Sequence, residues 1–198
     1  MLILRAALIF GQNAYYDIDL YNSGMEFFEK GQYNEAIALF NKSIQINSGN
    51  TIYFYRRGNA YYNMGQFELA IKDFKHCFDA LPDEAEYPFL MGMCYEKLNN
   101  LELALSNYNK AVEIYSDDVK FYRARAGLYN KLQNYPKVIE NYDSAIKLEP
   151  ENGASYFYRG AAKYKMNDKE NACVDWNIAL QKSYSKAAEY IDKVCKKP

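Results

Sequence analysis

Residues 51–84 read TIYFYRRGNAYYNMGQFELAIKDFKHCFDALPDE, and the pattern of this stretch returns every 34 residues along the chain. A small residue near the middle of its first half has counterparts at the same place in four other segments. The series is Gly24, Gly58, Gly92, Ala126 and Gly160. A period of this length is typical of arrays in which each unit is one supersecondary element.

Four further columns keep the same register. An aromatic residue stands three places after the small residue at Phe27, Tyr61, Tyr95 and Tyr129, and Lys163 breaks this column. A second small or apolar residue stands twelve places after the first at Ala36, Ala70, Ala104, Val138 and Ala172. A large aromatic residue and a last small residue follow at Phe40, Phe74, Tyr108, Tyr142 and Trp176, and at Ser43, Cys77, Ala111, Ala145 and Ala179. Such agreement over five units leaves a negligible chance of coincidence.

These columns resemble the tetratricopeptide repeat pattern, in which small, aromatic and proline positions recur at the same spacings. The resemblance covers residues 17–184 without insertion. It implies an all-α fold, a right-handed superhelical α-solenoid of five helix-turn-helix repeats with a C-terminal capping helix. The expected repeats are 17–50, 51–84, 85–118, 119–152 and 153–184, and the expected capping helix is 185–198.

Each repeat is expected to break into two helices where Gly or Asn occurs, because these residues are favoured just beyond a helix C-terminus. The expected breaks are Gly31, Gly65, Asn99-Asn100, Gln133-Asn134 and Asn167-Asp168. The expected helices are 18–30 and 33–46, 51–64 and 67–80, 85–97 and 101–115, 119–132 and 135–148, 153–166 and 169–182, and 185–196. One unit alone has too little core, and stacking of units buries a continuous apolar seam.

The composition is rich in aromatic residues and nearly neutral in charge. The 198 residues include 21 tyrosines, more than one closed core needs, which suggests long aromatic-lined surfaces. The net charge of −1 favours no partner class. From Val119 onward, however, there are 15 Lys and Arg and 9 Asp and Glu residues, against 9 and 16 before it. This asymmetry fits either drift in solvated helix faces or a partner of opposite polarity along its length.

The first sixteen residues, MLILRAALIFGQNAYY, begin with an apolar run that Arg5 interrupts. Two interpretations remain open, a capping helix over the first repeat and the remnant of an export signal. No stretch reaches the length of a membrane span. Both a cytoplasmic location and export to the bacterial periplasm or cell envelope are consistent with this segment.

Four cysteines occur, and two of them could form a disulfide. If 169–182 and the capping helix form a hairpin that turns near Tyr184, Cys173 and Cys195 each lie 11 residues from the turn and so at nearly the same height. Cys77 and Cys94 lie around a turn near Asp83, less symmetrically, and could form a second pair. The alternative is that all four cysteines are small buried residues in reduced form. A Cys173–Cys195 bond would favour an oxidising compartment.

No catalytic or metal-binding motif is present. The carboxylates are spread along helix positions, and the single His76 forms no triad. There is no glycine-rich phosphate loop, no HExxH and no EF-hand loop. The sequence therefore predicts no enzyme activity, no cofactor and no metal. The basic residues of the C-terminal half alternate with acidic ones, which argues against nucleic acid as a partner.

A protein or peptide is the expected partner, held in a concave groove lined by the first helix of each repeat. Side chains at matching places of these helices would line the groove: Tyr21, Asn22, Met25, Phe28, Tyr55, Arg56, Asn59, Tyr62, Phe89, Leu90, Met93, Glu96, Lys120, Arg123, Ala124, Asn130, Phe157, Tyr158, Ala161 and Tyr164. The predicted contact residues are Tyr21, Tyr55, Arg56, Asn59, Phe89, Arg123 and Tyr158. Tyr, Arg and Met are enriched at interfaces, although many of these tyrosines could simply pack between helices.

The favoured function is thus a protein-protein interaction scaffold that binds a peptide or helix. The lysines, asparagines and arginine of the carboxylate clamp in chaperone-binding tetratricopeptide domains are not found together at matching positions, so that ligand is not expected. One alternative is a self-assembling structural protein, a homo-oligomer in which Met1–Phe10 fills a neighbour's groove. Another is an enzyme or a carbohydrate binder that uses the aromatic groove for stacking.

Overall fold

The computed structural model describes the backbone of residues 2–196 and the side chains of residues 16–196, and all regular structure in this part is helical. The chain divides into two compact units, Met1–Asn107 and Tyr108–Pro198, with the boundary inside one helix. The elements are α1 Leu2–Glu29, α2 Tyr33–Ile46, α3 Thr51–Asn63, α4 Phe67–Ala80, α5 Glu86–Lys97, α6 Leu101–Ile114, α7 Val119–Lys131, α8 Tyr135–Leu148, α9 Gly153–Lys165, α10 Lys169–Gln181, α11 Ala187–Tyr190 and the π-helical turn η1 Ile191–Cys195.

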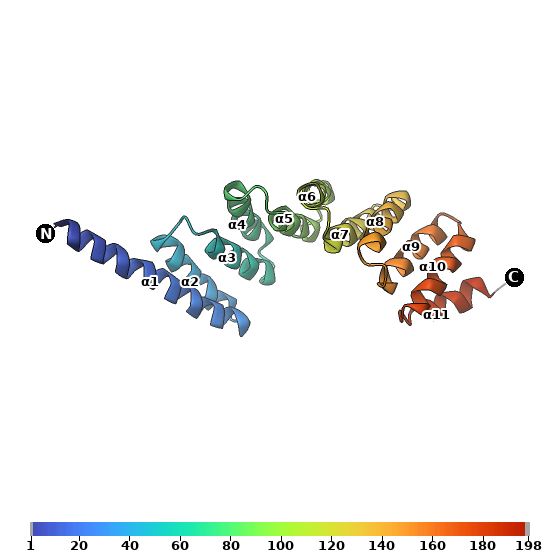
Figure 1. Ribbon diagram of the computed structural model, residues 1–198, viewed down its shortest axis with the longest axis horizontal. Helices are drawn as coiled ribbons and strands as arrows, with labels where there is room; N and C mark the ends of the chain where they lie inside the picture. The colour runs from blue at the N-terminus through green and yellow to red at the C-terminus, as the bar shows by residue number, and fades with distance from the viewer. Residues whose placement is uncertain (1, 197–198) are drawn as a thin grey trace. The chain divides into compact units, whose positions relative to one another are not determined.

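Each unit is built from helix hairpins that pack against the next hairpin along the chain. In the first unit α1 packs on α2 and α3 on α4, while α2 contacts α3 and α4 contacts α5 (Figure 1). In the second unit α7 packs on α8 and α9 on α10, and α8 contacts α9. The segments α11 and η1 pack against α10 at the C-terminal end (Figure 1). The fold is therefore an α-solenoid of helix-turn-helix repeats followed by a short C-terminal helix.

In every repeat, one residue of the turn between the two helices has a left-handed backbone conformation, with a positive φ angle. Gly31, Gly65, Asn99, Gln133 and Asn167 have φ angles of 73°, 74°, 57°, 55° and 65°. In the second repeat the amide of Gly65 donates to the carbonyl of Tyr62, and the amide of Gln66 donates to that of Tyr61, the pair of bonds that ends a helix in a Schellman motif. The predicted helix breaks are confirmed, and glycine and asparagine tolerate this conformation best.

The starts of the helices are also set by local chemistry. The side chains of Asn50, Asp118 and Asn152 accept a hydrogen bond from a backbone amide in the first turn of α3, α7 and α9. Asn134 and Asp168 do the same for α8 and α10. Such caps satisfy amides that have no partner within the helix and typically contribute about 1 kcal/mol each.

Four of the five sequence columns are buried in every repeat, and the column of Phe27, Tyr61, Tyr95 and Tyr129 is half-buried. Members of the second small and large aromatic columns, from Ala36 and Phe40 to Ala172 and Trp176, are buried in each repeat. The glycines let the paired helices approach the aromatic ring: a Cβ placed on Gly58 would lie 2.8 Å from Cε1 of Phe74. The matching distance from Gly24 to Cε1 of Phe40 is 2.7 Å. The first small column and the large aromatic column therefore contact each other within the same repeat.

An arginine ladder joins successive repeats, and sequence reasoning did not identify it. Arg159 on α9 donates to Asp175 on α10 of its own repeat, with Nη2···Oδ1 at 2.6 Å, and to Asp143 on α8 of the preceding repeat. Arg57 in the second repeat binds Asp73 and Asn41 in the same way. Arg125 in the fourth repeat binds the asparagines at the corresponding places, Asn141 and Asn109. In the third repeat this place holds Met91, which packs with Phe74 and Cys94 instead.

Two regions depart from the expected helices. The helix expected at 18–30 is the end of a longer helix, Leu2–Glu29, which also includes most of the apolar N-terminal segment. The side chains of residues 1–15 lie outside the described residues, and so does the capping contact predicted for them. At the other end, a four-residue α-helix and a π-helical turn replace the single helix expected at 185–196. None of the helices in the described part is long and apolar enough to cross a membrane.

Candidate functional site

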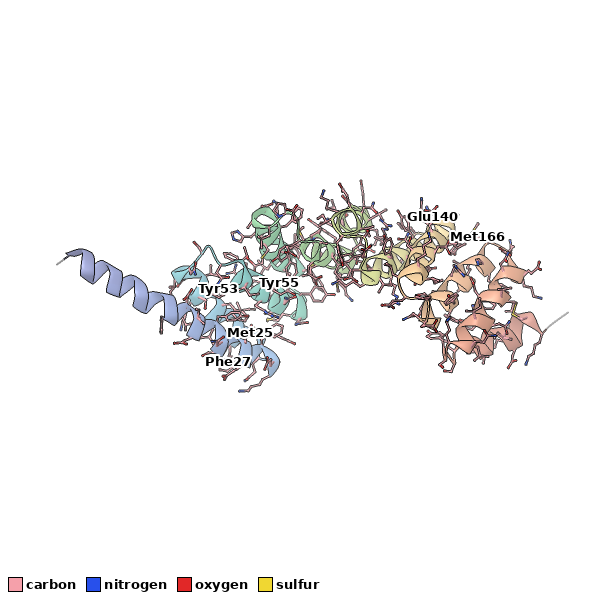
Figure 2. All side chains as sticks on the ribbon, in the orientation of Figure 1. Met25, Phe27, Tyr53, Tyr55, Glu140 and Met166 are labelled. Carbon is pink, nitrogen blue, oxygen red and sulfur yellow. A yellow bond between two sulfur atoms is a disulfide. The ribbon has the colours of Figure 1, made fainter. Side chains whose placement is uncertain are left out.

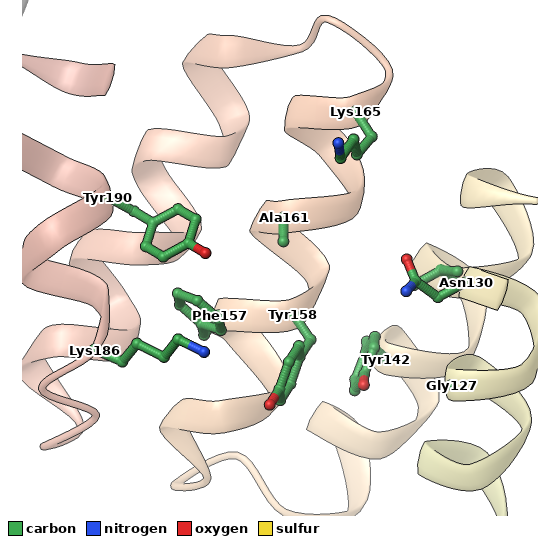
Figure 3. Close-up of a pocket in the computed structure, with 10 residues that line it drawn as sticks. Gly127, Asn130, Tyr142, Phe157, Tyr158, Ala161, Lys165, Lys186 and Tyr190 are labelled. Carbon is green, nitrogen blue, oxygen red and sulfur yellow. The ribbon is translucent and has the colours of Figure 1, made fainter. Parts of the chain in front are cut away.

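The second unit contains a pocket of about 530 Å³, a volume in the range of sites that hold small ligands or a few residues of a peptide. It is open to solvent, and Figure 3 shows its walls. Side chains from α7, α8, α9 and α11 line it: Gly127, Asn130, Val138, Tyr142, Phe157, Tyr158, Ala161, Lys165, Lys186 and Tyr190. First helices of two repeats and the C-terminal segment therefore contribute to one site.

The floor of the pocket is aromatic and tightly packed. Phe157 and Tyr142 are 2% and 8% exposed, whereas Tyr158 is 43% exposed and stands above them. The rings of Tyr142 and Tyr158 stack with centroids 5.8 Å apart and planes at 17° (Figure 3). Ring contacts of this kind fix the orientation of an exposed ring before any ligand arrives.

Burial and hydrogen bonding change the acidity of two tyrosines here. Burial raises the pKa of Tyr142 to about 12, so its phenol stays neutral at physiological pH. A hydrogen bond with Tyr158, together with burial, raises the pKa of Tyr184. These rings therefore act as neutral apolar surfaces with hydroxyl groups at their edges.

The wall opposite α7 comes from the C-terminal segment. Tyr190 meets the ring of Phe157 edge-on at 4.9 Å, and its centroid lies 5.2 Å from that of Trp176. Trp176 is fully buried and donates from Nε1 to the carbonyl of Phe157 at 3.2 Å. Together with Ala187 and Ile191, these residues belong to one buried cluster, which places the segment against α9 and α10.

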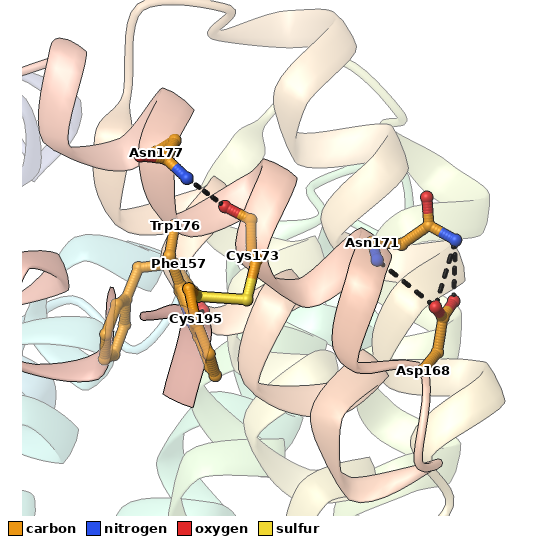
Figure 4. Close-up of a disulfide and its surroundings, with 7 residues drawn as sticks. All are labelled: Phe157, Asp168, Asn171, Cys173, Trp176, Asn177 and Cys195. Atoms are coloured by element: carbon orange, nitrogen blue, oxygen red, sulfur yellow. Dashed lines mark hydrogen bonds between the residues drawn. A yellow bond between two sulfur atoms is a disulfide. The ribbon is translucent and has the colours of Figure 1, made fainter. Parts of the chain in front are cut away.

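A disulfide joins this segment to α10. Cys173 and Cys195 are bonded, with Cα atoms 5.8 Å apart (Figure 4). They are the two cysteines that the hairpin geometry of the sequence brings to the same height. Lys186 and Tyr190 lie between α10 and Cys195 in the chain. The segment that carries them is therefore attached to α10 at its start by the backbone and at its end by the disulfide.

The charge around the pocket has one sign. Two lysines and no acidic residue are found among its described lining residues. The Nζ of Lys186 lies 5.5 Å from the centre of the Phe157 ring, a cation–π contact. Nearby Glu189 is already paired with Lys193 at 2.6 Å. The site therefore combines an apolar floor with a positive rim.

The predicted contact residues of the first unit are placed on α1, α3 and α5, mostly in packed positions. Tyr21 lies between the rings of Phe40 and Tyr53, at 5.9 and 5.3 Å. The ring of Tyr55, which Figure 2 labels, lies 6.1 Å from that of Tyr87 on α5, and the guanidinium of Arg56 lies 5.3 Å from the centre of the Tyr55 ring. The structure thus brings Tyr55 and Arg56 together and places Tyr21 in the packing between helices.

The other predicted residues have different surroundings. Asn59 and Phe89 are half-buried on α3 and α5. Arg123 pairs with Glu149, and its Nε is buried without a hydrogen-bond partner in the described part of the chain. Of the seven predicted contact residues, Tyr158 alone lines the pocket.

Several pocket residues were not predicted as contacts. Val138 and Tyr142 belong to the core columns and are 2% and 8% exposed, yet both line the pocket. Lys186 and Tyr190 belong to the C-terminal segment, in which the sequence predicted no contact residue. The spacing of Cys173 and Cys195 was the one signal in the sequence that pointed to the return of this segment.

The remaining reactive side chains do not form a catalytic group in the described residues. Cys77 and Cys94 are free and buried, and burial raises the pKa of each thiol to about 12. Thiolates are the reactive form, so both are inert at neutral pH. His76 stacks on Phe54 at 3.9 Å. No cluster of metal-ligating side chains is found in the part of the chain that the structure describes.

Comparison with known proteins agrees with this architecture. Models of the TPR repeat and of the tetratricopeptide repeat match residues 24–65, 52–83 and 85–118. No curated protein matches significantly. This chain is a tetratricopeptide repeat protein with five tandem repeats.

Solved structures of the same fold include MamA and YrrB. A crystal structure of MamA has a TM-score of 0.76 at 21% identity, covering 83% of this chain and 96% of MamA. MamA 41-end from Desulfovibrio magneticus RS-1 has a TM-score of 0.77 at 19% identity, covering 86% and 96%. YrrB, described as a TPR protein with an unusual peptide-binding site, has a TM-score of 0.74 at 16% identity, covering 94% and 97%. At these identities the likeness is one of fold.

Proposed function

We propose that this protein is a protein-interaction scaffold that binds a peptide or a helix of a partner protein on the aromatic surface of its first helices. The observation that carries this proposal is the pocket of about 530 Å³ in the second unit, which is open to solvent and has an apolar, aromatic lining. Half-exposed Tyr158 stands over this floor, and tyrosine is one of the residues most enriched at protein interfaces.

The geometry favours binding without rearrangement. Tyr158 is held by its stack on Tyr142 and by its ring contact with Tyr184, with centroids 6.5 Å apart, so little side-chain freedom is lost when a partner covers it. The family supports the same role, since tetratricopeptide arrays present rows of helices as extended surfaces. YrrB, of the same fold, is described as having a peptide-binding site.

A comparison of two tyrosine variants tests the proposal. The partner is first captured by crosslinking to the immobilised protein in an extract of the source cells and identified by mass spectrometry. Its affinity is then measured for the unmodified protein, for Tyr158→Ala and for Tyr115→Ala. Tyr115 is 53% exposed and lies outside the pocket, so it controls for loss of an exposed ring.

Tyr158→Ala is expected to weaken binding by about tenfold or more, as loss of an aromatic contact residue commonly does. Tyr115→Ala is expected to leave the affinity unchanged. Equal affinities of the two variants would remove the aromatic surface of the second unit from the proposal. Asn59→Ala extends the same test to α3 of the first unit, where the half-buried amide is a hydrogen-bonding group.

Self-assembly through Met1–Phe10 remains the alternative prediction, and the side chains of that segment lie outside the described residues. Light scattering over a range of protein concentrations separates the two functions. A concentration-independent monomer contradicts self-assembly, whereas growth that disappears on deletion of residues 1–10 supports it.

A further inference from the structure

The pocket of the second unit has a chemical preference that the general scaffold function does not specify. Its floor is apolar, formed by Phe157, Tyr142 and Val138, and its accessible lining includes the ring of Tyr158. The floor residues are nearly buried, whereas the ring of Tyr158 is 43% exposed, and an extended segment that only formed backbone contacts would leave this ring in water. An occupant that also inserts an apolar side chain removes this surface from water.

The rim adds a charge requirement. Lys165 on α9 and Lys186 ahead of α11 both line the pocket, on either side of the Phe157 and Tyr158 rings (Figure 3). Neither lysine forms an ion pair in the part of the chain that the structure describes; Glu189 pairs with Lys193 and interacts with Lys186 only through longer-range attraction. The two charged side chains among the described lining residues are both basic, which favours a negatively charged occupant.

We propose that this pocket holds an acidic segment of a partner protein, in which one aromatic or aliphatic side chain packs on the exposed ring of Tyr158 and flanking carboxylates pair with Lys165 and Lys186. This inference rests on the proposed scaffold function and names the chemistry of the partner. Asn130 on α7 offers an amide that can donate to or accept from the backbone of such a segment. The excess of basic residues after Val119 favours an acidic partner in the same way.

The C-terminal segment is part of this site. Lys186 supplies one of the two charges and Tyr190 closes the apolar wall against Phe157. Both are held in place by the bond between Cys173 and Cys195 (Figure 4). The acidic preference therefore belongs to the last repeat and its capping segment together, and no other repeat of the array has an equivalent of Lys186.

Three synthetic probes test the preference by fluorescence anisotropy with the full chain. The first is an end-blocked, dye-labelled peptide of about five residues, a length suited to the pocket volume, with a central phenylalanine flanked by glutamates. In the second probe lysines replace the glutamates, and in the third alanine replaces the phenylalanine. The first probe is expected to bind about tenfold more tightly than either of the others, since it alone satisfies both the floor and the rim.

Matched lysine variants complete the test. Lys165→Gln/Lys186→Gln is expected to abolish the preference for the acidic probe over the basic one. Lys137→Gln/Lys147→Gln removes the same charge from α8, where neither residue lines the pocket, and is expected to keep the preference. Trp176 emission and circular dichroism establish that each variant is folded.

Two results overturn the inference. The first would be that the acidic probe binds no more tightly than the basic and alanine probes. The second would be that the two lysine double variants show the same preference between the acidic and basic probes. The scaffold function is judged separately: if the natural partner depends on Tyr158 but not on Lys165 and Lys186, the function stands and this inference fails. If the partner depends on none of the three, both fail.

Discussion

Reduction of the Cys173–Cys195 disulfide is expected to loosen the C-terminal segment while the helix pairs before it stay folded. The segment after α10 contacts the rest of the unit mainly through Ala187, Tyr190 and Ile191. Repeat arrays have nearest-neighbour stability, so their ends open more readily than their middle. The bond joins Cys195 to α10 and thereby restrains this end.

The size of the effect follows from chain entropy. Cys173 and Cys195 are 22 residues apart. Because α10 extends to Gln181 and stays folded, the part of this loop that opens is only the chain after α10, about 14 residues, and closing such a loop restricts the open segment by about 3 kcal/mol at 25 °C. Loss of that restraint corresponds to a roughly 150-fold increase in the open population of the segment. The amides of Ala187–Cys195 should then exchange with solvent roughly 150-fold faster in the reduced protein.

Trp176 provides a direct optical measurement of the same event. It is the only tryptophan in the chain and is fully buried beside Tyr190. In urea, the shift of its emission should begin at a lower concentration in the reduced protein than in the oxidised one. Since Tyr190 and Lys186 line the pocket, reduction should also weaken binding of the acidic probe described above.

A double variant controls for effects of the reductant. Cys173→Ser/Cys195→Ser should behave like the reduced protein and should not respond to reductant. Cys77 and Cys94 are free in both states and do not contribute a difference. Equal urea transitions and equal exchange rates for Ala187–Cys195 in the oxidised and reduced forms would refute the role given to the bond.

Three further changes probe the packing of the repeats. Gly58→Ala should destabilise the protein by about 1 to 3 kcal/mol, because the added Cβ would lie 2.8 Å from Phe74. Gly127→Ala should stabilise α7 by about 0.5 to 1 kcal/mol, because a Cβ there has no atom within contact distance. Urea unfolding measures both changes. Asp175→Ala should cost about 3 kcal/mol, because this carboxylate is 2% exposed and its removal leaves partly buried Lys163 without its ion-pair partner and Arg159 with Asp143 alone. Equal stability of the variant and the parent in urea would contradict this. Burial raises the pKa of Tyr142 from 10.0 to about 12. The contribution of its neutral phenol to the free energy of unfolding is therefore complete below pH 10 and is lost as the pH rises toward 12, by about 1.4 kcal/mol per pKa unit. Unfolding at pH 8 and at pH 11 measures this loss.

The sequence by itself determined the repeat, the helix pairs and the core columns. Each of these depends on local interactions that recur every 34 residues. Gly65 adopts a positive φ because the turn after α3 requires it, and Gly58 faces Phe74 because both lie at fixed places in one hairpin. A periodic sequence pattern predicts these turns and contacts directly, since the same side chains pack in the same way in every repeat.

Only the tertiary structure decided where a pocket opens and what surrounds it. Tyr142 belongs to a core column, yet the spacing of α7 and α9 leaves it at the floor of a site. Tyr190 and Lys186 follow no repeat pattern, because at the end of the array no further repeat exists to cover Phe157. Exposure of a side chain depends on neighbours distant in the sequence, and a period detected within each repeat contains no information about a segment that occurs once.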